Sequence, residues 1–378
     1  MHLAEDTMSD PITDLLFSGL EEKVYPGAVL LVAKEGDVVF FRAVGNRAVI
    51  PERLPMEKDT IFDLASLTKP LATTLAVMKL VDGGLLEIDA PLSSLIQPFP
   101  WQDKAHISPR LLLNHASGLA DWRPFYEELV QLPPEQRKPA LRRLILEEPL
   151  SCEPKTVSLY SDLGFMLLEW IVESIAGKDL SSFLETRLYQ PLGLNTLYLD
   201  QIAAQRTHRK ELYAATEDCP WRKGIVQGHV HDENAFALGG YSGHAGLFGT
   251  AEDIFALTSM LVDLYHGERS ALLEEKTVRT FFARQELITG STWSLGWDTP
   301  SKENSSSGHY FGPKSIGHTG FTGTSIWIDL KKHVTVIFLT NRVHPTRSNQ
   351  KIKGFRPELH DLIMRELGYG CGYPKSEP

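Results

Sequence analysis

The sequence has few cysteines, no long apolar run and no excess of basic charge. Its three cysteines, Cys152, Cys219 and Cys371, are widely spaced and form no C-x-x-C pair. This spacing favours reduced thiols over a disulfide framework or a zinc site. No apolar run approaches the ~20 residues that a membrane-spanning helix needs. The 38 basic and 48 acidic residues give a formal net charge of −10, so binding to nucleic acid or anionic lipid is not expected.

The N-terminus also lacks the pattern of a secretory signal peptide. It reads MHLAEDTMSDPITDLL, with acidic residues where a signal would be basic and with no apolar segment following. We therefore expect a cytoplasmic protein, or a periplasmic or secreted one if a signal has been removed. The 378 residues predict two domains or one large domain with an insertion, since single cores stop growing at roughly 250–300 residues.

Short β-branched or aromatic runs, typical of strands, occur at both ends of the chain, at 28–33, 38–44, 325–330 and 334–340. Helical spacing of apolar residues fills most of the chain between them, at 68–81, 108–115, 139–146, 164–175 and 181–189, with a final helix at 357–367. We predict an α+β fold in which both chain ends form an antiparallel sheet flanked by helices, with an inserted, mostly helical domain. The sheet domain is placed at 1–72 and 255–378 and the helical domain at 73–254.

Ser66 and Lys69 lie where a strand-like segment, 61–64, gives way to a helical pattern. Their spacing places the hydroxyl and the amine on one helix face, and a helix N-terminus offers unpaired N–H groups. A serine there can pass its proton to a neutral amine while N–H groups face a developing oxyanion. Alternatively, Ser66 only caps the helix, because S-x-x-K recurs at Ser348 and Lys351 in a polar segment.

Two further motifs carry groups suited to acyl transfer. Tyr160 and Asp162 form a Y-x-D motif, in which a tyrosine beside a cationic lysine would have a lowered pKa and act as general base. Alternatively, Tyr160 is a core aromatic residue and Asp162 caps the helix at 164–175. The small residues of His318-Thr319-Gly320, before the strand at 325–330, allow a ligand to approach closely. This last motif is alternatively a simple turn.

The three motifs in this order resemble those of class C β-lactamases, serine DD-peptidases and family VIII esterases. The intervening stretches at 62–73, 111–119 and 239–253 also fit, so the resemblance covers nearly the whole chain. It implies the β-lactamase/transpeptidase-like fold, a helical domain beside a sheet, with the site at their junction.

The resemblance also implies a role for each motif residue. Ser66 is the nucleophile, and Lys69 tunes both Ser66 and Tyr160. Tyr160 acts as base and then as acid toward the leaving group, and His318 lines the far wall. The backbone N–H groups of Ser66 and Phe321 form the oxyanion hole. No cofactor or metal ion is implied.

Four residues are predicted to contact substrate: Asp162, Thr319, Gly320 and Arg342, the last as an anchor for a carboxylate. Alternatively, Arg342 lies at the solvated end of a strand. Asp162 stands where β-lactamases usually have asparagine, and His318 replaces the usual lysine. The charge of a histidine is largely lost above roughly pH 6.5. We therefore expect turnover of carboxylate-bearing substrates to fall above neutral pH, and β-lactam hydrolysis to be inefficient.

Two other segments contain groups that could form a site. Segment 239–246 nearly matches the G-x-S-x-G nucleophile motif, but His244 replaces its last glycine and no strand precedes it, so we expect a tight loop. A second group, which could bind a metal ion, lacks the H-E-x-x-H spacing of a helical zinc site, and the resemblance implies that it is structural: His229, His231, Asp232, Glu233 and His244.

The sequence therefore predicts a serine hydrolase that cleaves a small ester, amide or peptide substrate through a Ser66 acyl-enzyme. An esterase or a peptidase/amidase is favoured. A β-lactamase or DD-carboxypeptidase is the alternative for an exported protein, and a non-catalytic β-lactamase-like binding protein is the alternative of another class. No oligomeric state is predicted.

Overall fold

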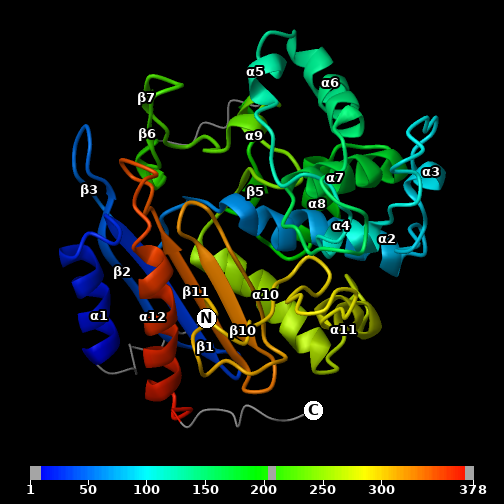
Figure 1. The fold of residues 1–378 in the computed structure, drawn as a ribbon. Coiled ribbons are helices and arrows are strands. Elements are labelled where there is room, and N and C mark those ends of the chain that lie inside the picture. Colours follow the sequence, from blue (N-terminus) through cyan, green and yellow to red (C-terminus); the bar gives the residue numbers. More distant parts are fainter. Residues whose placement is uncertain (1–9, 203–209, 371–378) are drawn as a thin grey trace.

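The computed structural model describes residues 10–202 and 210–370, and its central feature is a six-stranded antiparallel sheet in the order β3-β2-β1-β11-β10-β9 (Figure 1). β1 pairs with β2 on one side and with β11 on the other, so strands from the two ends of the chain lie side by side. This confirms the sheet that the sequence predicts. Its strands are β1 (Gly27–Lys34), β2 (Asp37–Ala48), β3 (Leu54–Pro55), β9 (Ile316–Thr319), β10 (Ser325–Asp329) and β11 (Val334–Thr340).

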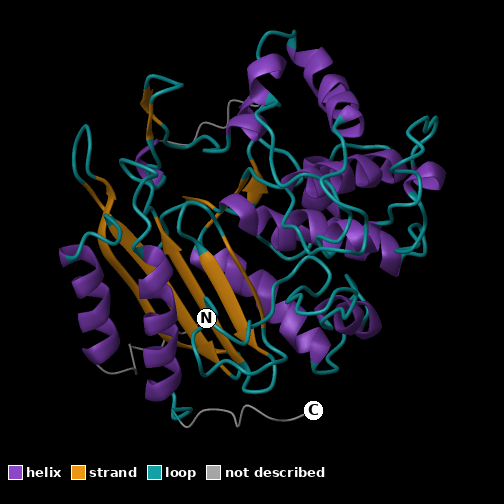
Figure 2. Ribbon diagram, in the orientation of Figure 1, coloured by secondary structure: helices purple, strands orange, loops and turns teal. Residues whose placement is uncertain are grey.

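The sheet is covered on both faces because successive side chains of a strand point to opposite sides. Ala28, Leu30 and Val32 of β1 belong to a core shared with helices α1 (Asp10–Glu21) and α12 (Ile352–Glu366). The alternate residues of β1, Val29 and Leu31 among them, face a second core shared with α10 (Ala251–Tyr265). Figure 2 shows the helices on either side of the strands.

Most of the remaining helices gather at one end of the molecule (Figure 1). They are α2 (Leu75–Asp82), α3 (Leu92–Leu95), α4 (Pro109–Leu113), α5 (Tyr126–Leu129), α6 (Pro134–Glu147), α7 (Asp162–Ala176), α8 (Leu180–Leu184), α9 (Glu233–Ala237) and, near the sheet, α11 (Glu275–Phe282). Shorter helical turns are η1 (Ala65–Leu67), η2 (Lys69–Thr74), η3 (Glu185–Tyr189) and η5 (Lys210–Leu212). There are also two small sheets. The first has the order β4-β8-β5, formed by β4 (Phe62–Asp63), β8 (Leu247–Gly249) and β5 (Tyr198–Leu199), and the second pairs β6 (Asp218–Cys219) with β7 (Gly224–Ile225).

Some predicted helix boundaries are wrong. α12 begins at Ile352 and contains Pro357, because Ile352 and Phe355 are buried against the sheet and this packing outweighs the hydrogen bond lost at proline. The segment predicted as one helix over 68–81 consists of the π-helical turn η2 followed by α2. The predicted domain boundary between residues 254 and 255 falls inside α10, which packs on the sheet, and the two-domain division stays a prediction.

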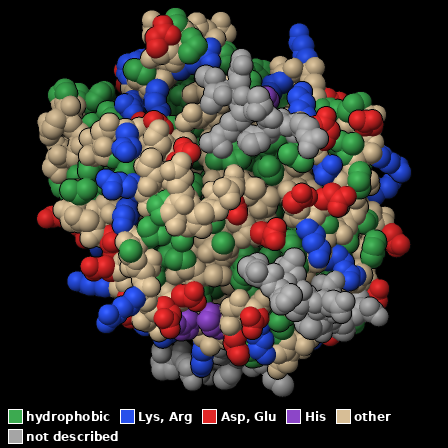
Figure 3. Space-filling view, turned by 180° about the vertical axis from the view of Figure 1, so that it is seen from behind, with side chains coloured by type: hydrophobic (Ala, Val, Ile, Leu, Met, Phe, Trp, Pro, Cys, Tyr) green, Lys and Arg blue, Asp and Glu red, His purple; other side chains and the backbone are tan. Residues whose placement is uncertain are grey.

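No helix within residues 10–202 and 210–370 is long and apolar enough to cross a membrane. Figure 3 shows acidic and basic side chains interspersed on the face opposite to that of Figure 1.

Candidate active site

Ser66 lies on a strained turn that directly follows β4. Ala65 has a φ of 48°, an uncommon value for a non-glycine residue, and Ser66 sits in the 3₁₀ turn η1. Lys69 begins the next turn, the π-helical η2, and its Nζ lies 3.2 Å from Ser66 Oγ. The sequence predicted the pairing, but not the strained turn that precedes it.

Asp63 holds this turn in place and was missed by the sequence analysis. Its carboxylate is buried and accepts hydrogen bonds from the backbone N–H of Ala65 at 2.9 Å and of His231 at 2.6 Å. The first bond fixes the residue before the nucleophile, and the second ties the turn to a distant loop. In the sequence, Asp63 is visible only as one polar residue in an otherwise apolar strand.

Lys69 is fully buried among groups that keep it positively charged. Its Nζ lies 2.7 Å from Asp162 Oδ1, 4.7 Å from the ring centroid of Tyr160, and 3.4 Å from the carbonyl oxygen of His244 to which it donates. Burial alone would lower the pKa of Lys69, but the Asp162 carboxylate and Tyr160 outweigh it and raise that pKa. Lys69 is therefore an ammonium in the resting protein.

Tyr160 is a neutral phenol, and the predicted lowering of its pKa is wrong. Burial raises the pKa of Tyr160, and Asp162 acts in the same direction. The charge of Lys69 and hydrogen bonds from Lys69 and Ser66 oppose this rise without overcoming it. Asp162 does not cap α7 as the alternative interpretation supposed, because the side chain of Ser161 accepts the capping hydrogen bond.

His115 binds the residues on both sides of Tyr160, and it is a second residue to which the sequence analysis assigned no role. Its carbonyl oxygen accepts from Leu159 N–H at 2.9 Å and its Nδ1 accepts from Ser161 N–H at 3.0 Å. Its ring packs 4.6 Å from the Tyr160 ring and 4.4 Å from Trp293. The only signal was that His115 lies within the stretch 111–119 of the family resemblance.

His318 lies on the other side of Tyr160, with ring centroids 6.1 Å apart. Its Nδ1 lies 2.9 Å from the carbonyl oxygen of Thr319. Burial, together with the charge of Lys69, lowers the pKa of His318 to about 3. The expectation that His318 carries a charge up to about pH 6.5 is therefore wrong, because a buried imidazole beside an ammonium stays neutral.

The segment after His318 meets the nucleophile turn closely. A side chain on Gly320 would lie 2.6 Å from the carbonyl oxygen of Leu64, so only glycine fits here. Thr322 Oγ1 donates to the Asp63 carbonyl at 2.8 Å, and Thr324 Oγ1 donates to that of Leu64 at 3.1 Å. These bonds fix the Phe321 loop relative to Ser66, as a two-part oxyanion hole requires.

The other two residues predicted to bind substrate lie next to this loop. Thr319 ends β9 and is partly exposed. Arg342 is nearly buried, and its guanidinium donates to the carbonyl oxygens of Phe321, Arg347 and Asn349. These contacts assign Arg342 to support of the Phe321 loop instead of substrate anchoring.

The rival nucleophile motif and the histidine-rich segment have structural roles. Ser242 is buried and its hydroxyl donates to Glu169 at 2.8 Å. The ring of His244 pairs with Asp232 at 3.0 Å. No group of three or more metal-binding side chains occurs within the described ranges. Cys152 and Cys219 are free thiols, and Cys371 lies outside the described residues.

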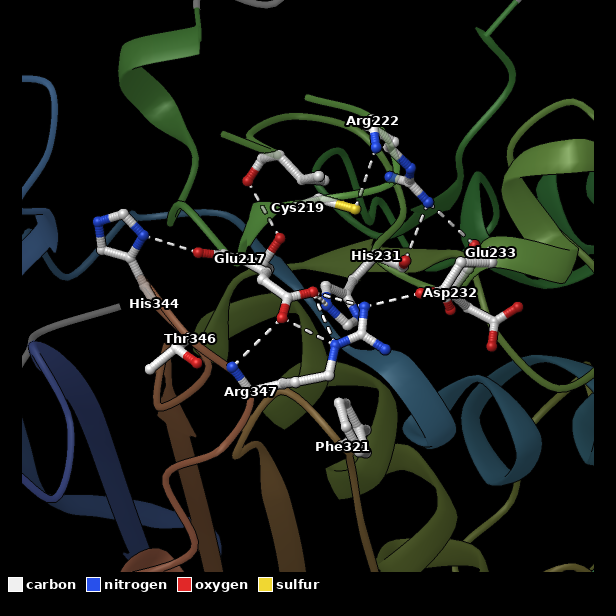
Figure 4. A network of polar contacts seen from close by, with 12 residues as sticks. Glu217, Cys219, Arg222, His231, Asp232, Glu233, Phe321, His344, Thr346 and Arg347 are labelled. Carbon is white, nitrogen blue, oxygen red and sulfur yellow. Dashed lines mark hydrogen bonds and ion pairs between the residues drawn. The ribbon is translucent and has the colours of Figure 1, made fainter. Parts of the chain in front are cut away.

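A charged network lies beside Phe321, and its members come from distant segments (Figure 4). Arg347 pairs with Glu217 at 2.5 Å and with Glu233 at 2.7 Å. His231 Nε2 lies 3.2 Å from Glu217, and the His231 ring stacks on Phe321 at 5.6 Å. We call these four residues, Glu217, His231, Glu233 and Arg347, the Arg347 network.

Known proteins resemble this chain over most of its length. The Beta-lactamase family matches residues 12–359. An N-acetylmuramyl-L-alanine amidase of Bacillus subtilis (strain 168) is 34% identical over 354 residues, covering 85% of this chain and 78% of that protein. A protein of Salmonella gallinarum (strain 287/91 / NCTC 13346), provisionally named D-alanyl-D-alanine carboxypeptidase, is 31% identical over 357 residues, covering 87% and 81%.

Among solved structures, the fold is similar to that of EstCE1, described as a hydrolase with promiscuous acyltransferase activity. The TM-score is 0.70 at 22% identity, and the match covers 92% of this chain and 97% of EstCE1. The family match, the relatives and the fold lead to one conclusion: this chain belongs to the β-lactamase family and is a serine hydrolase.

Proposed function

We propose that the protein cleaves a small ester or amide through an acyl-enzyme on Ser66, as an esterase or a peptidase/amidase. The observation that carries this proposal is the 3.2 Å contact between Lys69 Nζ and Ser66 Oγ. The same ammonium faces the Tyr160 ring. A hydroxyl, an ammonium and a phenol in contact are the groups that a serine nucleophile needs for activation.

In the first step, the phenolate form of Tyr160 accepts the proton of Ser66 as Oγ attacks the substrate carbonyl. Lys69 stays protonated and lowers the cost of that phenolate, since it opposes the effect of burial on the pKa of Tyr160. The oxyanion that forms accepts hydrogen bonds from the backbone N–H groups of Ser66 and Phe321.

In the second step, the tetrahedral intermediate collapses and the bond to the leaving group breaks. The Tyr160 phenol returns its proton to the departing alkoxide or amine. Water then attacks the acyl-enzyme in the same way, with Tyr160 as base, and releases the acid and free Ser66.

The names of the relatives, an amidase and a carboxypeptidase, support amide substrates. A β-lactamase or DD-carboxypeptidase activity is the second proposal for an exported form, and the cytoplasm remains the proposed location. The non-catalytic alternative has less support, since Ser66, Lys69 and Tyr160 are all retained in mutual contact.

The test is covalent labelling of Ser66. The protein is incubated with a fluorophosphonate and, separately, with labelled penicillin, and its intact mass is measured. We expect one fluorophosphonate adduct on the wild type and none on Ser66→Ala. An equal adduct on both proteins would contradict the proposal. Ser161→Ala is the matched control, because Ser161 lies close by but its hydroxyl donates to the Ala120 carbonyl.

A further inference from the structure

Two cations near the candidate active site, Lys69 and Arg347, already have carboxylate partners. Lys69 pairs with Asp162 at 2.7 Å. Arg347 pairs with Glu217 and Glu233 at 2.5 and 2.7 Å. Because each of these charges is balanced within the protein, an anionic substrate would have to compete with a carboxylate already in place.

The two groups that the sequence assigned to hold a carboxylate cannot do so in this arrangement. Arg342 directs its donors at the carbonyl oxygens of Phe321, Arg347 and Asn349. His318 is buried beside an ammonium and is neutral at physiological pH. Within residues 10–202 and 210–370, the charge of Arg342 has no carboxylate partner, but Arg342 is only 5% exposed and its donors are occupied by backbone carbonyl oxygens, so it cannot contact the carboxylate of a ligand directly.

The nearest negative charge acts in the same direction. Asp162 retains 17% exposure of its side chain while it contacts Lys69. It therefore stands partly open to solvent next to the amine that faces Ser66. A substrate carboxylate near Ser66 would meet a like charge where an asparagine would have offered an amide donor.

An aromatic surface lies beside the nucleophile instead of a cation. Phe321 follows the His318-Thr319-Gly320 motif and is 47% exposed. Its ring stacks on His231 at an interplanar angle of 22° (Figure 4). The Arg342 guanidinium lies 4.7 Å from the centroid of the same ring. These two contacts hold the ring in one orientation, so it is a preorganised surface for an apolar or aromatic group.

We propose that the site selects esters or amides that carry no carboxylate next to the scissile bond and that place an apolar or aromatic group against Phe321. This inference rests on the proposed function and specifies its substrate class. It separates this chain from an enzyme that removes a C-terminal amino acid, since such a substrate has a free carboxylate beside the bond that is cleaved.

The experiment uses the rate at which a neutral fluorophosphonate labels Ser66, because protection from labelling reports binding whether or not the competitor is hydrolysed. Two matched pairs of competitors are compared. Hippuryl-phenyllactate is set against its carboxamide, and monobenzyl succinate against benzyl succinamate. Within each pair, only the carboxylate changes, on the leaving-group side in the first and on the acyl side in the second.

We expect the neutral member of each pair to protect Ser66 at a concentration about 10- to 100-fold lower, the cost of placing a carboxylate in a site without a free partner. Equal or better protection by the carboxylate member of either pair would overturn the inference, and so would the absence of protection by any of the four. In both cases the labelling of Ser66 would still support the proposed function. Absence of Ser66 labelling without competitor would instead refute the proposed function.

A gain of charge provides the second test. Phe321→Lys keeps the backbone N–H but places an ammonium where the ring was. We expect this variant to lose protection by the neutral competitors and to gain protection by the carboxylates, so that the ratio within each pair falls by about tenfold or more. Phe17→Lys is the matched control, because Phe17 is 48% exposed on α1. An unchanged ratio in Phe321→Lys would contradict the role of the ring.

Discussion

Two charged clusters, one around the fully buried Lys69 and one around the partly exposed Arg347, lie near each other in this protein, and they differ in how completely their charges are balanced. In the Arg347 network, one guanidinium contacts two carboxylates, Glu217 and Glu233. At the candidate active site, Lys69 contacts one carboxylate, and it also faces a hydroxyl and a phenol.

Burial of charge alone therefore does not identify a catalytic site. In the Arg347 network the charges satisfy one another, which suits a support that holds the Phe321 loop. Around Lys69, the pKa of Tyr160 is raised and Lys69 stays an ammonium, so both groups hold a proton that can be exchanged with Ser66. Shifted pKa values do not separate the two clusters, because the pKa of Glu217 is shifted by its neighbours as well. What separates them is that Lys69 faces a hydroxyl and a phenol, groups that can exchange a proton.

The largest effect that separates the two clusters is expected from Tyr160→Phe. This change keeps the ring packing against His115 and removes only the hydroxyl. We expect kcat/KM for an ester to fall about 10²- to 10⁴-fold, the usual contribution of a general base. Tyr25→Phe is the control, because Tyr25 is buried and its hydroxyl donates to the Leu16 carbonyl. This variant should lose about 1 kcal/mol of stability and keep its full activity.

The second prediction concerns pH. Tyr160 is active as a phenolate and its pKa is raised, so kcat/KM should increase from neutral into alkaline pH. His318 is already neutral above about pH 3 and should add no inflection near pH 6.5. Because Asp162 raises the pKa of Tyr160, Asp162→Asn should move the rising limb of the profile to lower pH. A limb that stays in place or moves to higher pH would refute the proposed influence of Asp162.

The third prediction concerns the turn before the nucleophile. Asp63→Asn retains one carbonyl acceptor for the two backbone N–H groups of Ala65 and His231, but replaces the other acceptor with an amide donor. We expect a loss of about 1–3 kcal/mol in stability and a fall in kcat with little change in KM. A change in KM alone would show that Asp63 does not position Ser66.

The smallest effect on catalysis is expected in the Arg347 network. Glu217→Gln should cost about 1–2 kcal/mol of stability at pH 7, a modest value because Arg347 stays partly in water, and should leave kcat nearly unchanged. Burial would raise the pKa of Glu217, but hydrogen bonds from His231 and Arg347 lower it to about 2.

The pH dependence of that loss gives its control. A lowered pKa means that the Glu217 carboxylate stabilises the fold above its unfolded pKa near 4.5, and that this contribution is lost as the pH falls toward 2. Unfolding of the wild type and Glu217→Gln should therefore differ at pH 7 and converge only as the pH falls to about 2. A large fall in kcat at pH 7 would place Glu217 in catalysis and contradict the structural role of the Arg347 network.

The sequence was a good guide to the sheet and to the residues that meet at Ser66. Apolar β-branched runs at both chain ends can be buried together only when the ends pair, as β1 and β11 do. It was a poor guide to local strain and to protonation. The φ of Ala65 depends on acceptors supplied by Asp63, and the charge states of Tyr160 and His318 depend on how deeply they are buried.

The Arg347 network could not be predicted for another reason. Arg347 lies more than a hundred residues from both Glu217 and Glu233 in the sequence, and no local spacing links it to them. The same holds for His115, whose ring and carbonyl acceptors matter only because residues 159–161 pass beside them.

The central claim is that the acyl group of the substrate is carried by Ser66. The most direct measurement is an acid quench during steady-state turnover of a slowly hydrolysed ester, followed by mass spectrometry of the digested protein. The account predicts an acyl group on the peptide that contains Ser66, and a larger acylated fraction at the pH where Tyr160 is ionised. An acyl group on any other serine, or turnover that continues in Ser66→Ala, would contradict it.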